Sequence, residues 1–227
     1  MAPRLQIYLK VSSAGTSEGG CPFSGRVNMV TRLKVPESDY EFKPIDMDNK
    51  PPEFLKVNPS GEVPVLVDQE TGLTVTDSGK ITQYIESLYP NPPLKSNYDG
   101  PAVEATGGVF GGLAKLLFFK NKDEIPQLKA NLTAELKKVD DYLKSDARKG
   151  KYLLDNEFRE LDCMLVPRLR HVEIAGKYFH NYEIPSELTA LTEYNRVGQA
   201  AQIYQTIIPT DEDIVKSWTR HGVQRAV

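Results

Sequence analysis

The sequence predicts an α/β domain followed by an all-α domain. Short strand and helix patterns alternate over residues 1–89, a proline-rich segment follows at residues 90–101, and residues 102–227 carry helix patterns alone. A protein of 227 residues is long enough for two small domains, each with its own core. We therefore expect one domain at 1–89, a linker at 90–101 and a second domain at 102–227.

The first domain is expected to follow the order β-α-β-α-β-β-α. The segment LQIYLKV, beginning at Leu5, alternates apolar and polar residues as a half-buried strand does. Its first two strands are expected to run parallel and its last two to form a hairpin. The later elements are expected as a helix at 22–33, a strand at 40–45, a helix at 52–57, strands at 63–67 and 73–76, and a helix at 77–88.

The linker PNPPLKSNYDGP is rich in proline and turn-forming residues, and the segments after it have helical periodicity. Apolar residues at 132, 136, 139 and 143, for example, have the three-to-four spacing of an amphipathic helix. The helices expected in the second domain cover residues 106–121, 127–145, 161–179, 189–200 and 211–225.

The composition is that of an ordinary soluble globular protein, with 40% hydrophobic and 26% charged residues. A formal charge of −3 gives no reason to expect a nucleic-acid partner. Two cysteines are too few for a disulfide framework, and no cysteine or histidine spacing suggests a metal site. Because MAPRLQIYLKV lacks a long apolar stretch and no later run is long enough for a membrane span, we expect a soluble, cytoplasmic form that could also associate with membranes. We expect the soluble form to be a monomer.

The segment EGGCPFSGRVNMV carries the main candidate for chemistry, Cys21. Pro22 suits the first position of a helix, so Cys21 is expected at the helix N-terminus, where free N–H groups and the helix dipole favour a reactive thiolate. With Ser24 in place of a second cysteine the site would work as a monothiol, and the Ser24 hydroxyl is expected to stabilise the thiolate. The alternative is an inert, buried Cys21, which is how we interpret Cys163.

Two further motifs would complete a site around Cys21. Val63, directly before Pro64 at a strand start, can offer its backbone N–H and C=O to an extended peptide, especially across a cis bond. Asp77 and Ser78 precede an apolar-periodic helix, where they would cap it and hold a carboxylate. Together these features describe a binding site for glutathione, a γ-glutamyl tripeptide. Lys56 is either a partner for a glutathione carboxylate or a solvated surface lysine.

The segments EGGCPFS, PPEFLKVNPSGEVPVLVD with TDSGKITQYIE, and DNEFRELDCMLVPRLRHVEIAGKYFHNYEIP with TDEDI are similar to those of a known family. The protein resembles the glutathione transferase superfold and, within it, the chloride intracellular channel (CLIC) family, in an invertebrate form. The resemblance covers nearly the whole sequence. It implies a thioredoxin-like N-terminal domain, an all-helical C-terminal domain and glutaredoxin-like thiol chemistry.

The resemblance also implies roles for individual residues. Cys21 would be the active thiol, with its motif neighbours Pro22 and Phe23 in the glutathione site, and glutathione would be a co-substrate or an adduct. Val63 would be the backbone partner before a cis-proline, and Asp77 and Ser78 would form the γ-glutamyl pocket. The family is also credited with inserting into membrane lipid and conducting anions.

Charge is the main departure from that family pattern. A charged residue at the centre of a bilayer costs about 2.5–3.5 kcal/mol, so we predict that the segment from Cys21 to Ile45 does not span a membrane unaided. Another departure is Arg159, which stands where the family usually has a serine or threonine helix cap, so Asp162 is expected to lack its usual partner. The seven charged residues of the segment are Arg26, Arg32, Lys34, Glu37, Asp39, Glu41 and Lys43.

Three functions remain open from the sequence. The first is a glutathione-dependent monothiol oxidoreductase. The second is a redox- or pH-regulated anion channel in a membrane-inserted form. The third is a non-catalytic protein that acts as a scaffold or as a membrane-associated adaptor. Thiol reactivity at neutral pH separates the enzyme from the scaffold, and lipid-dependent insertion separates the channel from the enzyme.

Overall fold

The computed structural model describes residues 2–12, 19–95 and 100–226. These form two compact units. Unit 1 comprises Met1–Leu94 with Gln202–Asp213, and unit 2 comprises Lys95–Ala201 with Ile214–Val227. The predicted fold class is confirmed, since a thioredoxin-like sheet with helices is followed by a helical C-terminal region. Most of the loop predicted before Cys21 (13–18) and part of the predicted linker (96–99) lie outside the described residues.

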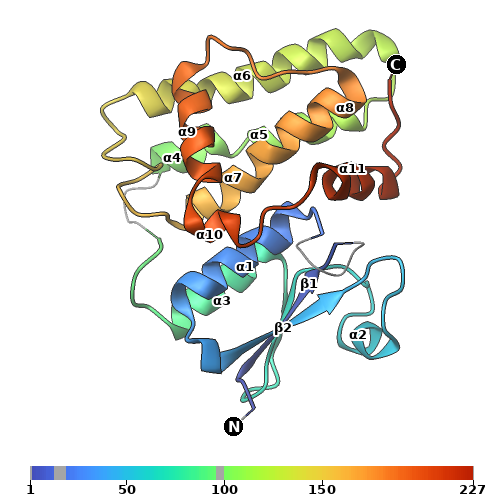
Figure 1. Ribbon diagram of the computed structural model, residues 1–227, viewed down its shortest axis with the longest axis vertical. Helices are drawn as coiled ribbons and strands as arrows, with labels where there is room; N and C mark the ends of the chain where they lie inside the picture. Colours follow the sequence, from blue (N-terminus) through green and yellow to red (C-terminus); the bar gives the residue numbers. More distant parts are fainter. Residues whose placement is uncertain (1, 13–18, 96–99, 227) are drawn as a thin grey trace. The chain divides into compact units, whose positions relative to one another are not determined.

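The sheet of unit 1 has four strands in the order β2-β1-β3-β4 (Figure 1). Strands β1 and β2 pair in parallel and β3 and β4 pair antiparallel, as expected. Strand β3 also pairs antiparallel with β1. Strand β3 begins two residues later than predicted, because Pro64 has no N–H for the ladder. The strands are β1 (Leu5–Lys10), β2 (Tyr40–Ile45), β3 (Val65–Asp68) and β4 (Thr74–Thr76).

Helices cover both faces of this sheet (Figure 1). Helices α1 (Pro22–Lys34) and α3 (Ser78–Leu88) lie side by side on one face. The short α2 (Pro52–Val57) packs on the other face, where the Phe54 ring lies 5.4 Å from that of Tyr8. A 3-10 turn, η1 (Glu37–Asp39), precedes β2, and α10 (Gln202–Gln205), which the sequence did not predict, also groups with unit 1.

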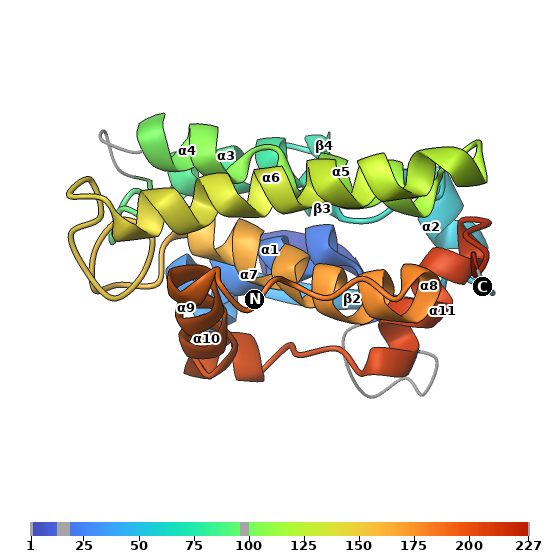
Figure 2. The ribbon, with the colours of Figure 1, turned by 90° about the horizontal axis from the view of Figure 1, so that it is seen from above.

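Unit 2 is built around α6, which packs against α4, α5 and α9 (Figure 2). The helix predicted at 106–121 is shorter in the structure, where α5 covers Val109–Leu117. Two glycines at 107 and 108 separate it from α4, because glycine is unfavourable inside a helix, and α4 itself begins within the predicted linker. The helical elements are α4 (Gly100–Thr106), α5 (Val109–Leu117), η2 (Lys122–Glu124), α6 (Ile125–Lys144), α7 (Glu160–His171), the π-helical turn η3 (Val172–Gly176), α8 (Lys177–His180), α9 (Thr189–Gln199) and α11 (Asp211–Arg220), which belongs to unit 2 from Ile214 on.

The start of α7 is stabilised by Asp162, whose side chain is fully buried. Its carboxylate accepts hydrogen bonds from the backbone N–H of Arg159 at 2.9 Å, the N–H of Leu153 at 3.1 Å and the hydroxyl of Tyr194 at 2.7 Å. Asp162 thus has no serine or threonine cap as its partner, and backbone groups and a tyrosine supply its hydrogen bonds instead. Desolvation nevertheless raises the pKa of Asp162 to about 6.

Candidate functional site

Cys21 is the N-cap residue of α1, as predicted. Its backbone is extended, with φ −114° and ψ 110°, and Pro22 occupies the first helical turn. The thiol is half-buried, and within the described part of the protein it makes no capping hydrogen bond to the helix. The first backbone N–H groups of α1 therefore have no partner from the side chain of the cap residue.

Ser24, in the same turn of α1, is fully buried. Its Oγ accepts a hydrogen bond from the backbone N–H of Lys10, the last residue of β1, at 3.2 Å. This bond fixes the start of α1 to the sheet and so holds Cys21 in place. The role predicted for the Ser24 hydroxyl beside the thiolate stays a prediction.

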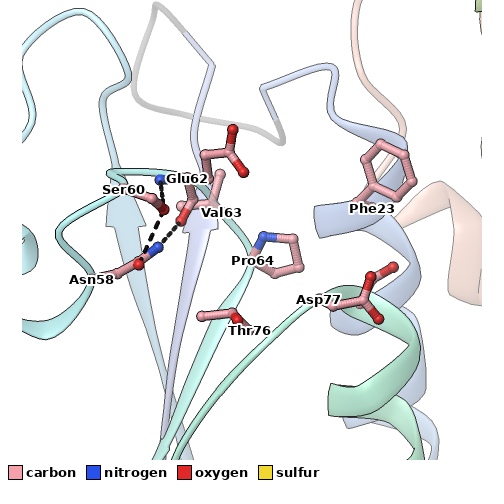
Figure 3. A pocket seen from close by; sticks show the side chains of 9 residues that line it. Phe23, Asn58, Ser60, Glu62, Val63, Pro64, Thr76 and Asp77 are labelled. Atoms are coloured by element: carbon pink, nitrogen blue, oxygen red, sulfur yellow. Dashed lines mark hydrogen bonds between the residues drawn. The ribbon is translucent and has the colours of Figure 1, made fainter.

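A cavity of about 500 Å³ lies between the loop before β3 and the first residues of α1 and α3 (Figure 3). Five of the predicted site residues line it: Phe23, Val63, Pro64, Asp77 and Ser78. The other four predicted site residues are not among the described residues that line the cavity; they are Cys21, Pro22, Ser24 and Lys56. Cys21 is two residues before the lining Phe23, whereas Lys56 is exposed on α2.

The Val63–Pro64 peptide bond on the cavity wall is cis. The backbone N–H and C=O of Val63 have no hydrogen-bond partner within residues 2–12, 19–95 and 100–226. An extended peptide in the cavity can therefore pair with Val63 as it would with a strand edge.

Asp77 caps α3 at the opposite side of the cavity (Figure 3). Its Oδ1 accepts hydrogen bonds from the N–H groups of Gly79 and Lys80, both at 3.0 Å. The backbone of Asp77 has φ 75°, a value that non-glycine residues rarely adopt and that costs on the order of 1–3 kcal/mol. Strain of this kind is held by the surrounding structure and is often found at functional sites.

Ser78 is buried beside Asp77, and its Oγ accepts a long hydrogen bond, 3.5 Å, from Nη1 of Arg26 on α1. A guanidinium group can only donate, so the Ser78 hydroxyl proton is left to donate elsewhere. Ser78, the first residue of α3, therefore presents a donor suited to a carboxylate.

The sequence reasoning missed part of the cavity wall. Asn58, Ser60, Glu62 and Thr76 also line it, and none of them was predicted as a site residue. The available signal was the turn sequence Asn-Pro-Ser-Gly between a short helix and Val63-Pro64, since asparagine, serine and glycine fix turns through side-chain bonds and positive φ.

Comparison with known proteins identifies the family. The model of the glutathione S-transferase N-terminal domain matches residues 19–93. A rice protein described as probable glutathione S-transferase DHAR2, chloroplastic, is 32% identical over 200 residues, which cover 88% of this chain and 70% of that protein. The protein belongs to the glutathione S-transferase family.

Some relatives of this glutathione S-transferase family member are named dehydroascorbate reductases, and another is named a chloride intracellular channel. The crystal structure of Chlamydomonas reinhardtii dehydroascorbate reductase superposes with a TM-score of 0.84 at 29% identity, covering 97% of this protein and all of that one. The Drosophila melanogaster chloride intracellular channel Clic is 30% identical over 220 residues, covering 95% of this protein and 81% of that one. The transferase fold and family are confirmed, and the narrower CLIC assignment stays a prediction.

Proposed function

We propose that this protein is a glutathione-dependent thiol oxidoreductase in which Cys21 is the reacting group. The observation that carries the proposal is the uncapped, half-buried Cys21 at the start of α1, next to a cavity lined by Val63 and by the start of α3. A thiol at a helix start, a strand-like backbone and a carboxylate pocket are the three groups that a γ-glutamyl tripeptide needs.

Glutathione would bind along the cavity wall. Its cysteinyl residue would pair with the backbone of Val63, beside Phe23 and the ring of Pro64. Its γ-glutamyl carboxylate would accept from the hydroxyl and the backbone N–H of Ser78, and its ammonium would face the Asp77 carboxylate. This orientation directs the glutathione sulfur toward the start of α1.

The reaction is thiol–disulfide exchange in two steps. The Cys21 thiolate attacks the glutathione sulfur of a mixed disulfide, and the substrate leaves as a thiolate, which takes up a proton. A second glutathione thiolate then attacks the same sulfur, releases Cys21 as a thiolate and forms oxidised glutathione. The substrate is reduced by two electrons, and two glutathione molecules become one disulfide.

Dehydroascorbate is a specific substrate candidate, because similar proteins are named for its reduction. Here the Cys21 thiolate would add to a carbonyl carbon of dehydroascorbate. Glutathione would then attack the Cys21 sulfur and expel ascorbate, and a second glutathione would resolve the Cys21–glutathione disulfide. Two glutathione molecules supply the two electrons and two protons that ascorbate gains.

The deciding experiment measures glutathione-dependent reduction of dehydroascorbate and of hydroxyethyl disulfide side by side, with oxidised glutathione detected by coupling to glutathione reductase. We expect turnover of at least one substrate and, after treatment with oxidised glutathione alone, a single adduct on the peptide that contains Cys21. Intact, folded protein without turnover or adduct would overturn the proposal and favour a scaffold.

Anion conduction is the second candidate, and the similarity to the Drosophila channel protein favours it. None of the helices formed by the described residues has the length and apolar composition needed to cross a bilayer. In α1, Lys34 has a fully buried side chain that forms a 2.6 Å ion pair with Glu86 of α3, which insertion of α1 would have to break. Chloride efflux from anionic liposomes at pH 5.5 and 7.4, with and without oxidant, tests this candidate directly.

A further inference from the structure

The loop at residues 58–62, between α2 and the cis peptide, is closed on itself by side-chain hydrogen bonds (Figure 3). Asn58 Nδ2 donates to the backbone C=O of Glu62 at 2.8 Å. Ser60 Oγ donates to Asn58 Oδ1 at 3.1 Å and accepts from the N–H of Glu62 at 3.3 Å. Asn58 is therefore the centre of a network that ends at the residue directly before Val63.

Asn58 is itself anchored to the core of unit 1. It follows α2 as its C-cap, and its N–H donates to the C=O of Phe54 at 2.8 Å. Phe54 is fully buried in a cluster with Ile45 and Val65. Asn58 is only 8% exposed. Through its bonds to Phe54 and Glu62 it connects the buried core to the loop.

Gly61 lets the loop close. Its φ is +66°, and its N–H donates to the C=O of Asn58 at 2.9 Å. A Cβ at this position would meet Lys50 Nζ at 2.9 Å and would force a left-handed backbone on an L-residue. The turn is thus shaped for the network that Asn58 makes.

The geometry of the peptide unit transmits this network to the cavity. The C=O of Glu62 and the N–H of Val63 belong to one trans peptide plane, in which the two bonds point in opposite directions. When Asn58 holds the C=O of Glu62, it also fixes the direction of the Val63 N–H. That N–H is one of the two backbone groups available to an extended ligand.

We propose that Asn58 is a positioning residue for glutathione, acting through the Glu62–Val63 peptide; this inference rests on the proposed function. Asn58 orients the strand-like partner of the tripeptide before it binds, so that little order has to be created on binding. Its loss is expected to weaken glutathione binding and to leave the chemistry of Cys21 unchanged.

The test compares Asn58→Asp, Asn58→Ala and Ser60→Ala with the unaltered protein. Asn58→Asp keeps the size of the residue and removes the donor to Glu62, so it is the sharpest variant. We expect the KM for glutathione to rise about tenfold, or about 1.4 kcal/mol, with kcat at saturating glutathione within about twofold. Ser60→Ala, which removes the indirect bonds, is expected to raise KM about threefold.

Three controls separate positioning from general damage. The rate at which iodoacetamide alkylates Cys21 does not involve glutathione and should not change. Asn121→Ala removes another asparagine whose side chain fixes a turn, by accepting from the N–H of Asp123, but this turn lies in unit 2. Its KM for glutathione should stay unchanged. The binding of reduced glutathione is also measured directly by calorimetry on every variant.

An unchanged KM and an unchanged calorimetric affinity in folded Asn58→Asp would overturn the inference. A fall in kcat as large as the rise in KM, together with slower alkylation of Cys21, would also overturn it, because that pattern indicates a distorted helix start. If the unaltered protein reduces no substrate yet binds glutathione, the proposed chemistry fails while calorimetry still tests Asn58. If it does not bind glutathione, both proposals fail.

Discussion

The starts of α1 and α7 show two ways of treating the N-terminus of a helix. At α7 a buried carboxylate, Asp162, accepts from the N–H of the cap residue and from two other donors. At α1 the cap residue is Cys21, and among the described residues its thiol makes no capping bond. Within the part of the chain that the structure describes, neither cap residue bonds to its helix through its side chain, but the first turn of α7 holds a buried, hydrogen-bonded carboxylate, whereas α1 has a thiol at its cap position.

The difference has a physical cost and a chemical use. A good N-cap residue contributes about 1 kcal/mol to stability, and α1 forgoes that contribution. Its cap position holds a half-buried thiol instead. The following predictions test the contrast between a thiol at the start of one helix and a buried carboxylate at the start of the other.

Cys21→Ser should produce the largest effect. The hydroxyl cannot replace the thiolate as a nucleophile, so glutathione-dependent turnover should fall on the order of a thousandfold or more. Serine is also a better N-cap than cysteine, so the free energy of unfolding should rise by up to about 1 kcal/mol. Coupled turnover assays and urea unfolding measure the two effects on the same preparation. Lower stability with retained turnover would remove the contrast between the two helix starts.

Asp162→Ala should give the opposite pattern. Three donors, two of them in fully buried hydrogen bonds, lose their acceptor, so the free energy of unfolding should fall by about 3 kcal/mol. Because Asp162 belongs to unit 2 and does not line the cavity, the KM for glutathione at 20 °C should not change. Urea unfolding followed by circular dichroism measures the stability, and a large change in KM with small destabilisation would contradict the assignment.

The pH dependence of stability provides a second test of Asp162. Its pKa is raised to about 6 by burial, above the unfolded value of about 3.9. The folded state therefore holds the proton more tightly, and the stabilisation present below about pH 4 is lost as the pH rises to about 6. Compared with Asp162→Asn, the unaltered protein should lose roughly 3 kcal/mol over this range. A relative gain over the same range would mean that the hydrogen bonds outweigh desolvation.

The contrast also explains what the sequence could and could not predict. Pro22 after Cys21 identified the start of α1, and the spacing of apolar residues identified α6, because both signals are local. The partners of Asp162 were missed because Leu153 and Tyr194 approach it through tertiary structure. At the cavity, Val63 was found from a motif, whereas the bonds that make Asn58 a wall residue depend on the closed turn.

Helix α3 is intermediate, because its cap residue Asp77 also lines the cavity. Asparagine is a good N-cap and tolerates positive φ, so Asp77→Asn should change the stability by less than about 0.5 kcal/mol. It removes the negative charge that would face the glutathione ammonium, so the KM for glutathione should rise about tenfold. Asp77→Ala should show that loss together with about 1 kcal/mol of destabilisation. Equal KM values for the Asn and unaltered forms would assign Asp77 to capping alone.

Arg159→Ser should give the smallest effect, and it makes at α7 the change that Cys21→Ser makes at α1. The serine hydroxyl can accept from the N–H of Asp162, worth about 1 kcal/mol, while the half-exposed ion pair of Arg159 with Asp155 is lost. The net gain should be about 0.5 kcal/mol, measured by urea unfolding, with turnover unchanged. A net loss would show that the ion pair already does the work of a cap. A gain in stability without loss of activity at Arg159, compared with a gain accompanied by loss of activity at Cys21, would show that the cap position of α1 carries the reacting group and that of α7 does not.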